Sequence, residues 1–340
     1  MPSVVQLGAL TAVVVDWNLP DHTIRSVRSL VEDGVPPERI VIVENGSSDD
    51  CWGQVAAALS SCVLVRLDRN VGFARANNIG AGVLPGSAYL FVNNDAFVRR
   101  PGSVAMLLGA LERPRAGMVV PRLLNEDLTL QPIVVPFTTP VVALVRASGL
   151  SRFLPNRWQP RWSTHWDHSS SREIEAAIGA VILVRGEIWE ALGGFREASF
   201  MYAEDIDLCW SARDCGWATW FEHAAEFVHL GGASSGTRWS VQERAERVGR
   251  AEAETIRQHL SPARAAATLA LMRIGVGVRS ACFRLIRNDV AAASCRGYFR
   301  GYGMPPDRRD ESGVGPRVGQ EIGPGVEVVC PSMGHSRRSS

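Results

Sequence analysis

Lysine is absent from this chain of 340 residues, so all 36 of its basic side chains are arginine. They are matched by 35 acidic residues, which leaves a formal net charge of +1. A chain so close to neutrality carries no bulk field that would attract nucleic acid, and we expect no nucleic-acid partner. The missing lysine indicates a bias in base composition rather than a chemical requirement.

Paired cysteines are also missing. The seven cysteines are scattered and form no C-x-x-C pair, which excludes a disulfide framework and a zinc site of that type. A reducing, cytoplasmic compartment is therefore expected. Residues 1–12 lack the basic segment and cleavage site of a signal peptide, and no uncharged apolar run reaches about 18 residues, so no membrane span is expected.

Two common nucleotide-binding motifs are absent as well. The chain contains neither G-x-G-x-x-G nor G-x-x-x-x-G-K, so the sequence supports neither a Rossmann dinucleotide site nor a P-loop. A nucleotide, if one binds, must be held by another arrangement.

Short apolar runs do recur through the first 120 residues, at 12–15, 40–43, 63–65, 89–92 and 118–120. Helical patterns separate them at 21–31, after the turn at 44–49, around Asn77 and Asn78, and at 103–111, which predicts an α/β fold with a mostly parallel sheet flanked by helices. Polar clusters follow the strand ends at 16–18, 44–49, 70–78 and 93–95. Ligands of such sheets bind beyond the carboxyl ends of the strands, so these clusters predict a site of nucleotide size.

The pattern weakens from residue 123 to residue 172, where Pro, Trp and His accumulate. We expect an aromatic-lined loop near the site, because long loops in compact domains tend to be functional. A metal site at His165 and His168 is the less favoured alternative. Further on, 176–184 predicts another strand and 227–229 a last short strand that ends at His229.

Three carboxylates, Glu204, Asp205 and Asp207, lie within four positions at the start of a helical pattern. Acidic residues are favoured in the first turn of a helix, so simple capping is one interpretation. A functional site is the other, because aromatic residues flank the cluster and a histidine follows at position 229. The residues alone leave both interpretations open.

The end of the chain is helical and then polar. Residues 240–260 predict a charged helix. Residues 262–288 combine apolar side chains with arginine, which is typical of an amphipathic helix on anionic lipid or of a core-packed helix with exposed arginines. From 304 to 340 Gly, Pro, Ser and Arg dominate, and we expect a disordered tail.

Six motifs stand in the same order as in the family 2 glycosyltransferases, and over residues 10–260 the chain resembles the rhamnosyltransferase-like branch of that family. The motifs are Glu44-Asn45-Gly46-Ser47-Ser48-Asp49, the run from Asn70 to Gly80, Asn93-Asn94-Asp95, Gly193-Gly194-Phe195, the run from Phe200 to Leu208, and His229.

The resemblance implies a GT-A fold, a nucleotide-sugar donor, a divalent cation (Mg or Mn) and inversion at the anomeric carbon. By position, Asp205 matches the catalytic base, and Asp95 and His229 match the metal-side residues. The expected donor-binding residues are Asn18, Glu44, Asn45, Asp49, Asn70, Gly72, Phe73, Asn77, Asn93 and Asn94. The expected acceptor or orienting residues are Glu204, Asp207 and Trp210.

Three positions depart from the family pattern. Glu44 replaces an Asp that binds the nucleotide base in the family, and Asn93 replaces the first Asp of the metal-binding D-x-D element. Ser211 stands where an Arg often follows Trp210. We expect a dTDP-sugar such as dTDP-rhamnose as donor, or a related UDP-sugar, and a lipid-linked saccharide or another cell-envelope glycan precursor as acceptor. The alternatives are a nucleotidyltransferase that makes a nucleotide sugar and a non-catalytic glycan- or nucleotide-binding homologue.

The expected organisation is a GT-A domain at 1–260, a helical extension at 261–303 and the tail. Within the first domain, 10–122 would form the nucleotide-binding half and 123–260 the acceptor and catalytic half. Contact of 262–288 with the inner face of the cell membrane would make the protein peripheral.

Overall fold

A large β-sheet forms the centre of the computed structural model, which describes residues 7–47, 50–149, 153, 155, 166–197, 202–231, 239–305, 326–329 and 337–338. The strands of the first half are β1 (Leu10–Asp16), β2 (Ile40–Asn45), β3 (Val63–Leu67), β4 (Ala88–Asn93) and β5 (Ala96–Val98). Those of the second half are β6 (Ala116–Leu124), β7 (Leu130–Gln131), β8 (Val134–Val135), β9 (Arg172–Ile174), β10 (Ala176–Ala177), β11 (Val181–Arg185), β12 (Ala218–His229), β13 (Val326–Val329) and β14 (Arg337–Arg338).

The principal strands follow the order β3-β2-β1-β4-β11-β6-β12. Strands β3, β2, β1 and β4 pair in parallel, β11 is antiparallel to both of its neighbours, and β6 and β12 again pair in parallel. Six of these seven strands therefore run in one direction, and the predicted mostly parallel sheet is confirmed. Their carboxyl ends, together with the start of β11, meet at one edge.

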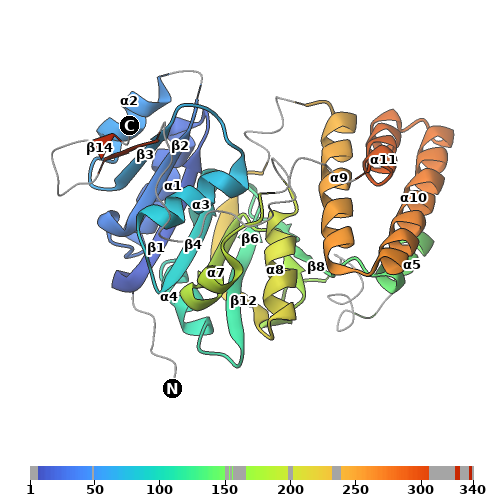
Figure 1. Ribbon diagram of the computed structural model, residues 1–340, viewed down its shortest axis with the longest axis horizontal. Helices are drawn as coiled ribbons and strands as arrows, with labels where there is room; N and C mark the ends of the chain where they lie inside the picture. Colours follow the sequence, from blue (N-terminus) through green and yellow to red (C-terminus); the bar gives the residue numbers. More distant parts are fainter. Residues whose placement is uncertain are drawn as a thin grey trace.

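Helices cover the sheet in the predicted alternation with strands (Figure 1). On the first half lie α1 (Pro20–Glu32), α2 (Cys51–Ala58), α3 (Phe73–Val83) and α4 (Ser103–Ala110). On the second half lie α7 (Gly186–Leu192) and α8 (Glu204–Asp214), which contact β4, β11 and β12. All of these except α2, which packs on α1, contact strands that are buried on both sides, as expected for a parallel sheet.

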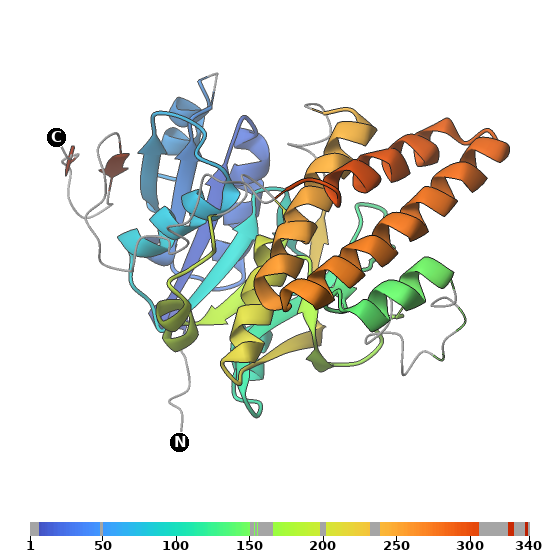
Figure 2. The same ribbon diagram turned by 45° about the vertical axis from the view of Figure 1, so that its right-hand side comes forward.

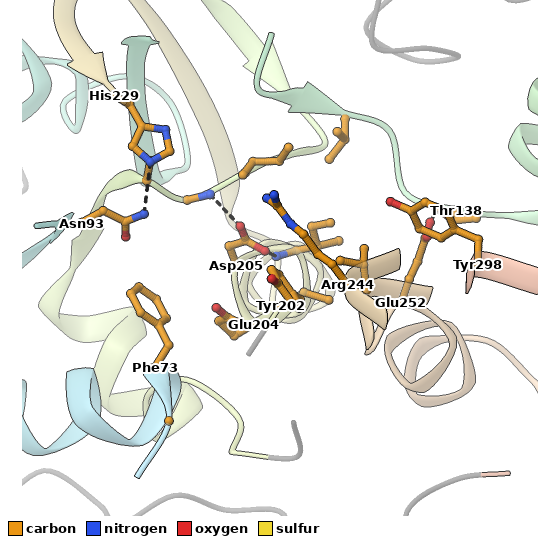
Figure 3. A pocket seen from close by; sticks show the side chains of 18 of the residues that line it. Phe73, Asn93, Thr138, Tyr202, Glu204, Asp205, His229, Arg244, Glu252 and Tyr298 are labelled. Atoms are coloured by element: carbon orange, nitrogen blue, oxygen red, sulfur yellow. Dashed lines mark hydrogen bonds between the residues drawn. The ribbon is translucent and has the colours of Figure 1, made fainter. Parts of the chain in front are cut away.

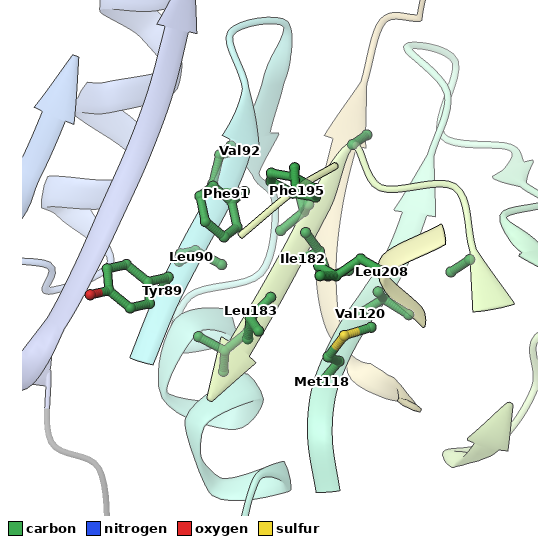
Figure 4. Close-up of a cluster of buried hydrophobic side chains, with 14 of the residues drawn as sticks. Tyr89, Leu90, Phe91, Val92, Met118, Val120, Ile182, Leu183, Phe195 and Leu208 are labelled. Atoms are coloured by element: carbon green, nitrogen blue, oxygen red, sulfur yellow. The ribbon is translucent and has the colours of Figure 1, made fainter. Parts of the chain in front are cut away.

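The core is continuous across the reversed strand β11 (Figure 4). Phe91 on β4 pairs with Ile182 on β11, and Leu183 lies opposite Leu90 on one side and Val119 on the other. The ring of Phe195 meets that of Phe91 edge-on, with centroids 4.9 Å apart. Both halves of the chain therefore share one hydrophobic core, which holds the strand ends of the two halves at fixed positions.

A second group of helices stands beside the sheet: α5 (Pro140–Ser148), α9 (Val241–His259), α10 (Pro262–Leu285) and α11 (Asp289–Gly301) (Figures 1 and 2). Helix α10 packs on α5, α9 and α11 and exposes its other face. Among the described residues it alone is long and apolar enough to cross a membrane, and 33% of that stretch is buried in the protein. A partly packed helix passes this test by length and composition alone, so the finding is weak evidence for a span.

Three local expectations were wrong. The run 176–184 forms two strands, β10 and β11, because residues 178–180 leave the sheet to meet helix α8. The strand ending at His229 has twelve residues rather than three, and polar side chains around its irregular register at Glu222–Glu226 hide it in the sequence. Part of the tail is also ordered, because β13 pairs with the edge strand β3, whereas residues 306–325 lie outside the described residues.

Helix α3 approaches the sheet closely at Gly80. A Cβ added there would lie 2.6 Å from Val13 Cγ1 and 2.8 Å from Val43 Cγ2, whereas one added at Gly82 meets nothing within 4 Å. The two glycines share a helix but differ in their surroundings, so they form a matched pair.

We predict that Gly80→Ala lowers the free energy of unfolding by about 1–3 kcal/mol through overpacking. Gly82→Ala should raise it by up to about 1 kcal/mol, because alanine favours the helix. Urea titrations of both variants measure the difference, and equal effects would contradict the close packing of α3 on β1 and β2.

Candidate active site

A cavity of about 710 Å³ opens at the carboxyl edge of the sheet, where the polar strand ends were predicted to meet. Its lining comes from both halves of the sheet and from the helical group. In Figure 3, Asp205 lies between Asn93 and His229 on one side and Glu252 and Tyr298 on the other. The cavity therefore has a sheet-side arm and a helical arm, which meet at the first turn of α8.

The loops after β2 and β3 form one wall of the sheet-side arm. Asn45 Oδ1 accepts a hydrogen bond from Val71 N at 2.9 Å, and Asn70 Oδ1 accepts from Gly72 N at 3.0 Å. The loops also approach closely at Gly46, where an added Cβ would lie 2.2 Å from the carbonyl carbon of Arg69. Asn45, Asn70, Gly72 and Phe73, four of the residues assigned to donor binding from the sequence, line this arm.

A buried polar cluster holds the turn between β4 and β5. The hydroxyl of Thr23 donates to Asp16 Oδ1 at 2.6 Å, and Asn94 Nδ2 donates to the same oxygen at 3.3 Å. Burial of Asp16 raises the pKa of its carboxyl above the usual value. The cluster links the ends of β1 and β4, and so fixes Asn93, Asn94 and Asp95 in the cavity wall.

Asp95 and His229 come together at the end of the sheet-side arm, because β12 pairs with β5 up to His229 and Ala96. Asp95 Oδ1 lies 3.2 Å from His229 Nε2, and the Asn93 side-chain amide lies 3.5 Å from the same nitrogen. The sequence predicted this pair as metal-side residues. Residues 134 positions apart in the chain therefore meet in the fold.

Gln131 on β7 orients the His229 ring, a contact that the sequence analysis missed. Gln131 Nε2 donates to Asn125 Oδ1 and to the His229 carbonyl, so its Oε1 is the atom 2.7 Å from His229 Nδ1. His229 Nδ1 therefore carries a hydrogen, and Nε2 faces the Asp95 oxygen with its lone pair in the neutral tautomer. Two facing acceptors require a proton or a cation between them.

This pair fits a divalent cation, because carboxylate oxygen and neutral imidazole are both suitable ligands and a neighbouring amide fixes the imidazole. No cluster of three or more His, Cys, Asp or Glu residues suited to a metal occurs in the described part of the chain. A cation held here would take its other ligands from donor oxygens and water, as Mg typically does with phosphates.

Helix α8 begins in the centre of the cavity after two strained residues. Tyr202 and Ala203 have φ values of 82° and 65°, in the left-handed region that residues other than glycine rarely adopt. The helix then starts with Glu204 and Asp205, which both line the cavity. This local geometry turns the first turn of the helix toward the sheet edge.

Backbone amides hold both oxygens of Asp205. Gly179 N donates to Oδ2 at 2.6 Å, and Ile206 N donates to Oδ1 at 2.7 Å. An added Cβ on Gly179 would lie 2.9 Å from Asp205 Cβ, so glycine is needed for this approach. Burial is the main reason that the pKa of Asp205 is raised, and each oxygen keeps a lone pair for a ligand.

Glu204 lies beside Asp205 in the same cavity. Burial, and then the neighbouring charge of Asp205, raise the pKa of Glu204 to about 8. Its Oε2 is buried and has no hydrogen-bond partner among the described residues. Adjacent carboxyls in one buried site favour a state with a single negative charge, so Asp205 is the better candidate for the ionised group.

Several predicted site residues lie outside the cavity lining. Trp210 was expected to orient the acceptor, but it is 2% exposed and stacks on His259, so it packs the framework. Asp207 is also buried, and it pairs with Arg196 and His259. Asn77 donates to the carbonyl of Phe73 within α3 and is 1% exposed, so the expected donor contact is replaced by an intrahelical one.

Glu44 and Asn18 lie near the donor wall without lining the cavity. Glu44 Oε1 accepts from Ser47 N at 2.6 Å, and Asn18 N donates to Ser47 Oγ at 3.0 Å. Asp49 lies outside the described residues.

The alternative metal site at His165 and His168 is not supported. His168 is fully buried, and its Nε2 accepts from the backbone amides of Ile133 and Val134 at 3.3 Å each. His165, like Trp158 and Trp162 of the expected aromatic loop, lies outside the described residues.

The helical arm was not predicted from the sequence. Arg244, Val248 and Glu252 line it from α9, and Met272, Val276 and Arg279 line it from α10. Positions four apart share one face of a helix, so each helix presents a continuous stripe to the cavity. In the sequence, only the spacing of these residues could have indicated the helix faces that they form. No short motif connects those faces with Asp205.

Comparisons with known proteins agree with this architecture. Residues 12–149 match Glycosyl transferase family 2. The N-acetylglucosaminyl-diphospho-decaprenol L-rhamnosyltransferase of Mycobacterium tuberculosis is 30% identical over 245 residues, which cover 67% of this chain and 78% of that protein. An O-antigen biosynthesis protein of Myxococcus xanthus is 28% identical over 53% of this chain and 14% of its own length.

Among solved structures, a mannosyltransferase of Pyrobaculum calidifontis, in complex with GDP-mannose and Mn²⁺, has a TM-score of 0.54. It is 16% identical, and the match covers 86% of this chain and 84% of that protein. The likeness concerns the fold, which is the GT-A arrangement of a large sheet flanked by helices. With the sequence match to the rhamnosyltransferase, it establishes that the chain is a glycosyltransferase and belongs to glycosyl transferase family 2.

Proposed function

We propose that this protein is an inverting glycosyltransferase that moves rhamnose, or a similar sugar, from a dTDP donor to a hydroxyl of a lipid-linked saccharide. The observation that carries the proposal is the position of Asp205 between the two arms of one cavity. The relative from Mycobacterium tuberculosis, a rhamnosyltransferase named for a diphospho-decaprenol-linked sugar, supports the choice of transferred sugar and acceptor.

The sheet-side arm suits the donor. Asn70 and Asn93 offer side-chain amide groups for a nucleotide, and Phe73 offers an apolar ring. Asp95 and His229 would hold a divalent cation, which would neutralise the charge that develops on the leaving diphosphate. His229 is oriented by Gln131, so this part of the site is preorganised.

Asp205 suits the role of general base. As the acceptor oxygen attacks the anomeric carbon, Asp205 takes the hydroxyl proton, and the bond from that carbon to the donor diphosphate breaks on the opposite side. One displacement of this kind inverts the configuration and needs no protein nucleophile. A raised pKa improves the match between a carboxylate base and an alcohol proton at neutral pH.

The helical group has the composition expected of a segment that attaches to the inner face of the cell membrane. Residues 262–301 contain seven arginines and one acid, Asp289. Ile274 and Val278 are 61% and 58% exposed on the outer face of α10. Each basic residue near an anionic surface contributes about 1 kcal/mol, and the exposed apolar side chains add burial in the interface.

The metal pair generates the first prediction here. Asp95→Ala should abolish the Mn-dependent part of dTDP binding and leave the fold intact, because it removes a ligand oxygen and not a core contact. Gln131→Leu should weaken Mn affinity by roughly 10–100-fold, since it releases the His229 ring. Calorimetric titrations with and without Mn measure both effects.

Asp127→Ala is the control for these variants, because it removes an exposed carboxylate outside the cavity. Unchanged Mn dependence in Asp95→Ala would rule out this metal assignment.

The base generates a second prediction. Asp205→Asn should lower kcat by about 10²–10⁴-fold with dTDP binding nearly unchanged, because the lost interaction belongs to the transition state. In the wild type, kcat/KM should fall as the pH drops through the raised pKa of Asp205, hence above the ordinary carboxyl range. A variant that kept more than about a tenth of the wild-type kcat would remove Asp205 from this role.

The membrane contact generates a third prediction. Ile274→Glu combined with Val278→Glu should reduce flotation of the full-length protein with anionic liposomes at least several-fold, because both charges would enter the interface. Val241→Glu, at an exposed apolar position on α9, is the matched control. Equal flotation of the double variant and the wild type would refute attachment through α10.

A further inference from the structure

The helical arm of the cavity has more positive charge than its acidic residue can balance. Glu252 is saturated by Thr138 at 2.9 Å, Arg146 at 3.4 Å and Tyr302 at 2.7 Å. Arg146 and Glu252 therefore neutralise one another. The other two arginines of the arm, Arg244 and Arg279, have no carboxylate within ion-pair distance in the described part of the chain.

These two arginines keep hydrogen-bond donors for a ligand. Arg279 Nη1 donates to the Arg146 carbonyl at 3.1 Å, which holds the guanidinium at the cavity wall and leaves its other N–H groups. No hydrogen bond from the Arg244 side chain to another described residue is formed, and Figure 3 shows Arg244 between Asp205 and Glu252. Two spare guanidinium groups in one cavity match a doubly charged anion such as a diphosphate diester.

An apolar surface lies next to these charges. Val248 follows Arg244 by one turn on α9, and Met272 and Val276 line the cavity from α10 at 6% and 4% exposure. Tyr298 adds a ring from α11. A free phosphate or nucleotide gains nothing from this surface, whereas a hydrocarbon chain attached to the anion would bury it.

The anion cannot be the donor diphosphate in the proposed reaction. The leaving group departs on the side of Asp95 and His229, and the attacking hydroxyl must arrive from the other side of the sugar. Asp205 separates the two sides in Figure 3, and the arginines lie with the helical arm. The spare charge therefore faces the acceptor.

We propose that the helical arm binds the diphosphate group and the first apolar units of a lipid-linked acceptor, with Arg244 and Arg279 on the phosphates and Val248, Met272 and Val276 against the chain. This inference rests on the proposed function, since it assigns the acceptor side of the same site. It makes Arg244 a binding residue for the acceptor rather than a catalytic residue.

The test uses full-length protein and farnesyl diphosphate as a short isoprenoid probe, in EDTA so that no cation recruits the diphosphate to the sheet-side arm. Inorganic diphosphate and farnesol carry the two halves of the probe separately. We expect the intact probe to bind at least about tenfold more tightly than either half, which corresponds to 1.4 kcal/mol or more.

The variants separate the two contributions. Arg244→Gln should weaken both farnesyl diphosphate and inorganic diphosphate by about tenfold, as expected for one charged hydrogen-bonding partner. Val248→Asn should weaken the affinity for farnesyl diphosphate and leave the affinity for inorganic diphosphate unchanged. Arg264→Gln removes an exposed arginine of α10 outside the cavity and should change neither affinity by more than about twofold.

Three results would overturn the inference: equal affinity of farnesol and farnesyl diphosphate, equal affinity of inorganic diphosphate and farnesyl diphosphate, or equal losses in Arg244→Gln and Arg264→Gln. Titration of dTDP with Mn is run in parallel. Failure of the wild-type protein to bind dTDP would contradict the proposed function. Binding of dTDP without binding of farnesyl diphosphate would contradict only the acceptor site. Circular dichroism melting confirms that each variant is folded.

Discussion

The hydrogen bond from Gly179 N to Asp205 Oδ2 joins the two parts of the molecule on which the site depends. Gly179 stands just before the reversed strand β11, and Asp205 stands in the first turn of α8. Because β11 runs against its neighbours, its start reaches the edge where β1, β2 and β4 end. The segment that leads into the reversed strand thus supplies a backbone amide to the Asp205 carboxylate, while the ends of the parallel strands supply the asparagine side chains and the Asp95–His229 pair. A side chain at position 179 would push Asp205 away from the sheet.

The backbone before α8 is strained, and this strain is part of the free-energy cost of placing Asp205 at the edge of the sheet. Tyr202 and Ala203 both adopt left-handed φ values, and non-glycine residues in that region cost of order 1–3 kcal/mol each. The burial of Glu204 and Asp205 adds a free-energy cost for their charged forms, and the raised pKa values of both carboxyls reflect it. Neither feature stabilises the fold. Strain and buried charge at the same four residues are typical of a functional site, where the surrounding structure maintains a geometry that the local sequence would not choose.

Much of this site could be predicted because it is local in the chain. The strand ends at Asn45 and Asn93–Asp95, and the acidic start of α8, are short patterns whose place in an α/β sheet follows from the order of strands. Gln131 and Gly179 were missed, because each acts through a contact with a residue 26 or more positions away, and Arg244 was missed because only the fold brings α9 to the cavity. Trp210 and Asp207 were placed wrongly for the opposite reason: they are close to Asp205 in sequence, but the helix turns them into the core. Proximity in sequence misleads on a helix, where positions two and five residues on point in other directions.

The contacts of Asp207 and Trp210 explain how the two arms are kept in one geometry. His259, at the end of α9, lies with Nε2 3.1 Å from Asp207 and Nδ1 3.2 Å from Asp214, and its ring stacks on Trp210. All three partners belong to α8, the helix that carries Asp205. The helix that presents Arg244, Val248 and Glu252 is therefore fixed at its far end to the helix that presents Asp205. Because a packed helix moves as a rigid unit, this junction sets the distance between the helical arm and Asp205. Under the proposed function, residues that line neither arm would therefore determine where an acceptor hydroxyl can lie.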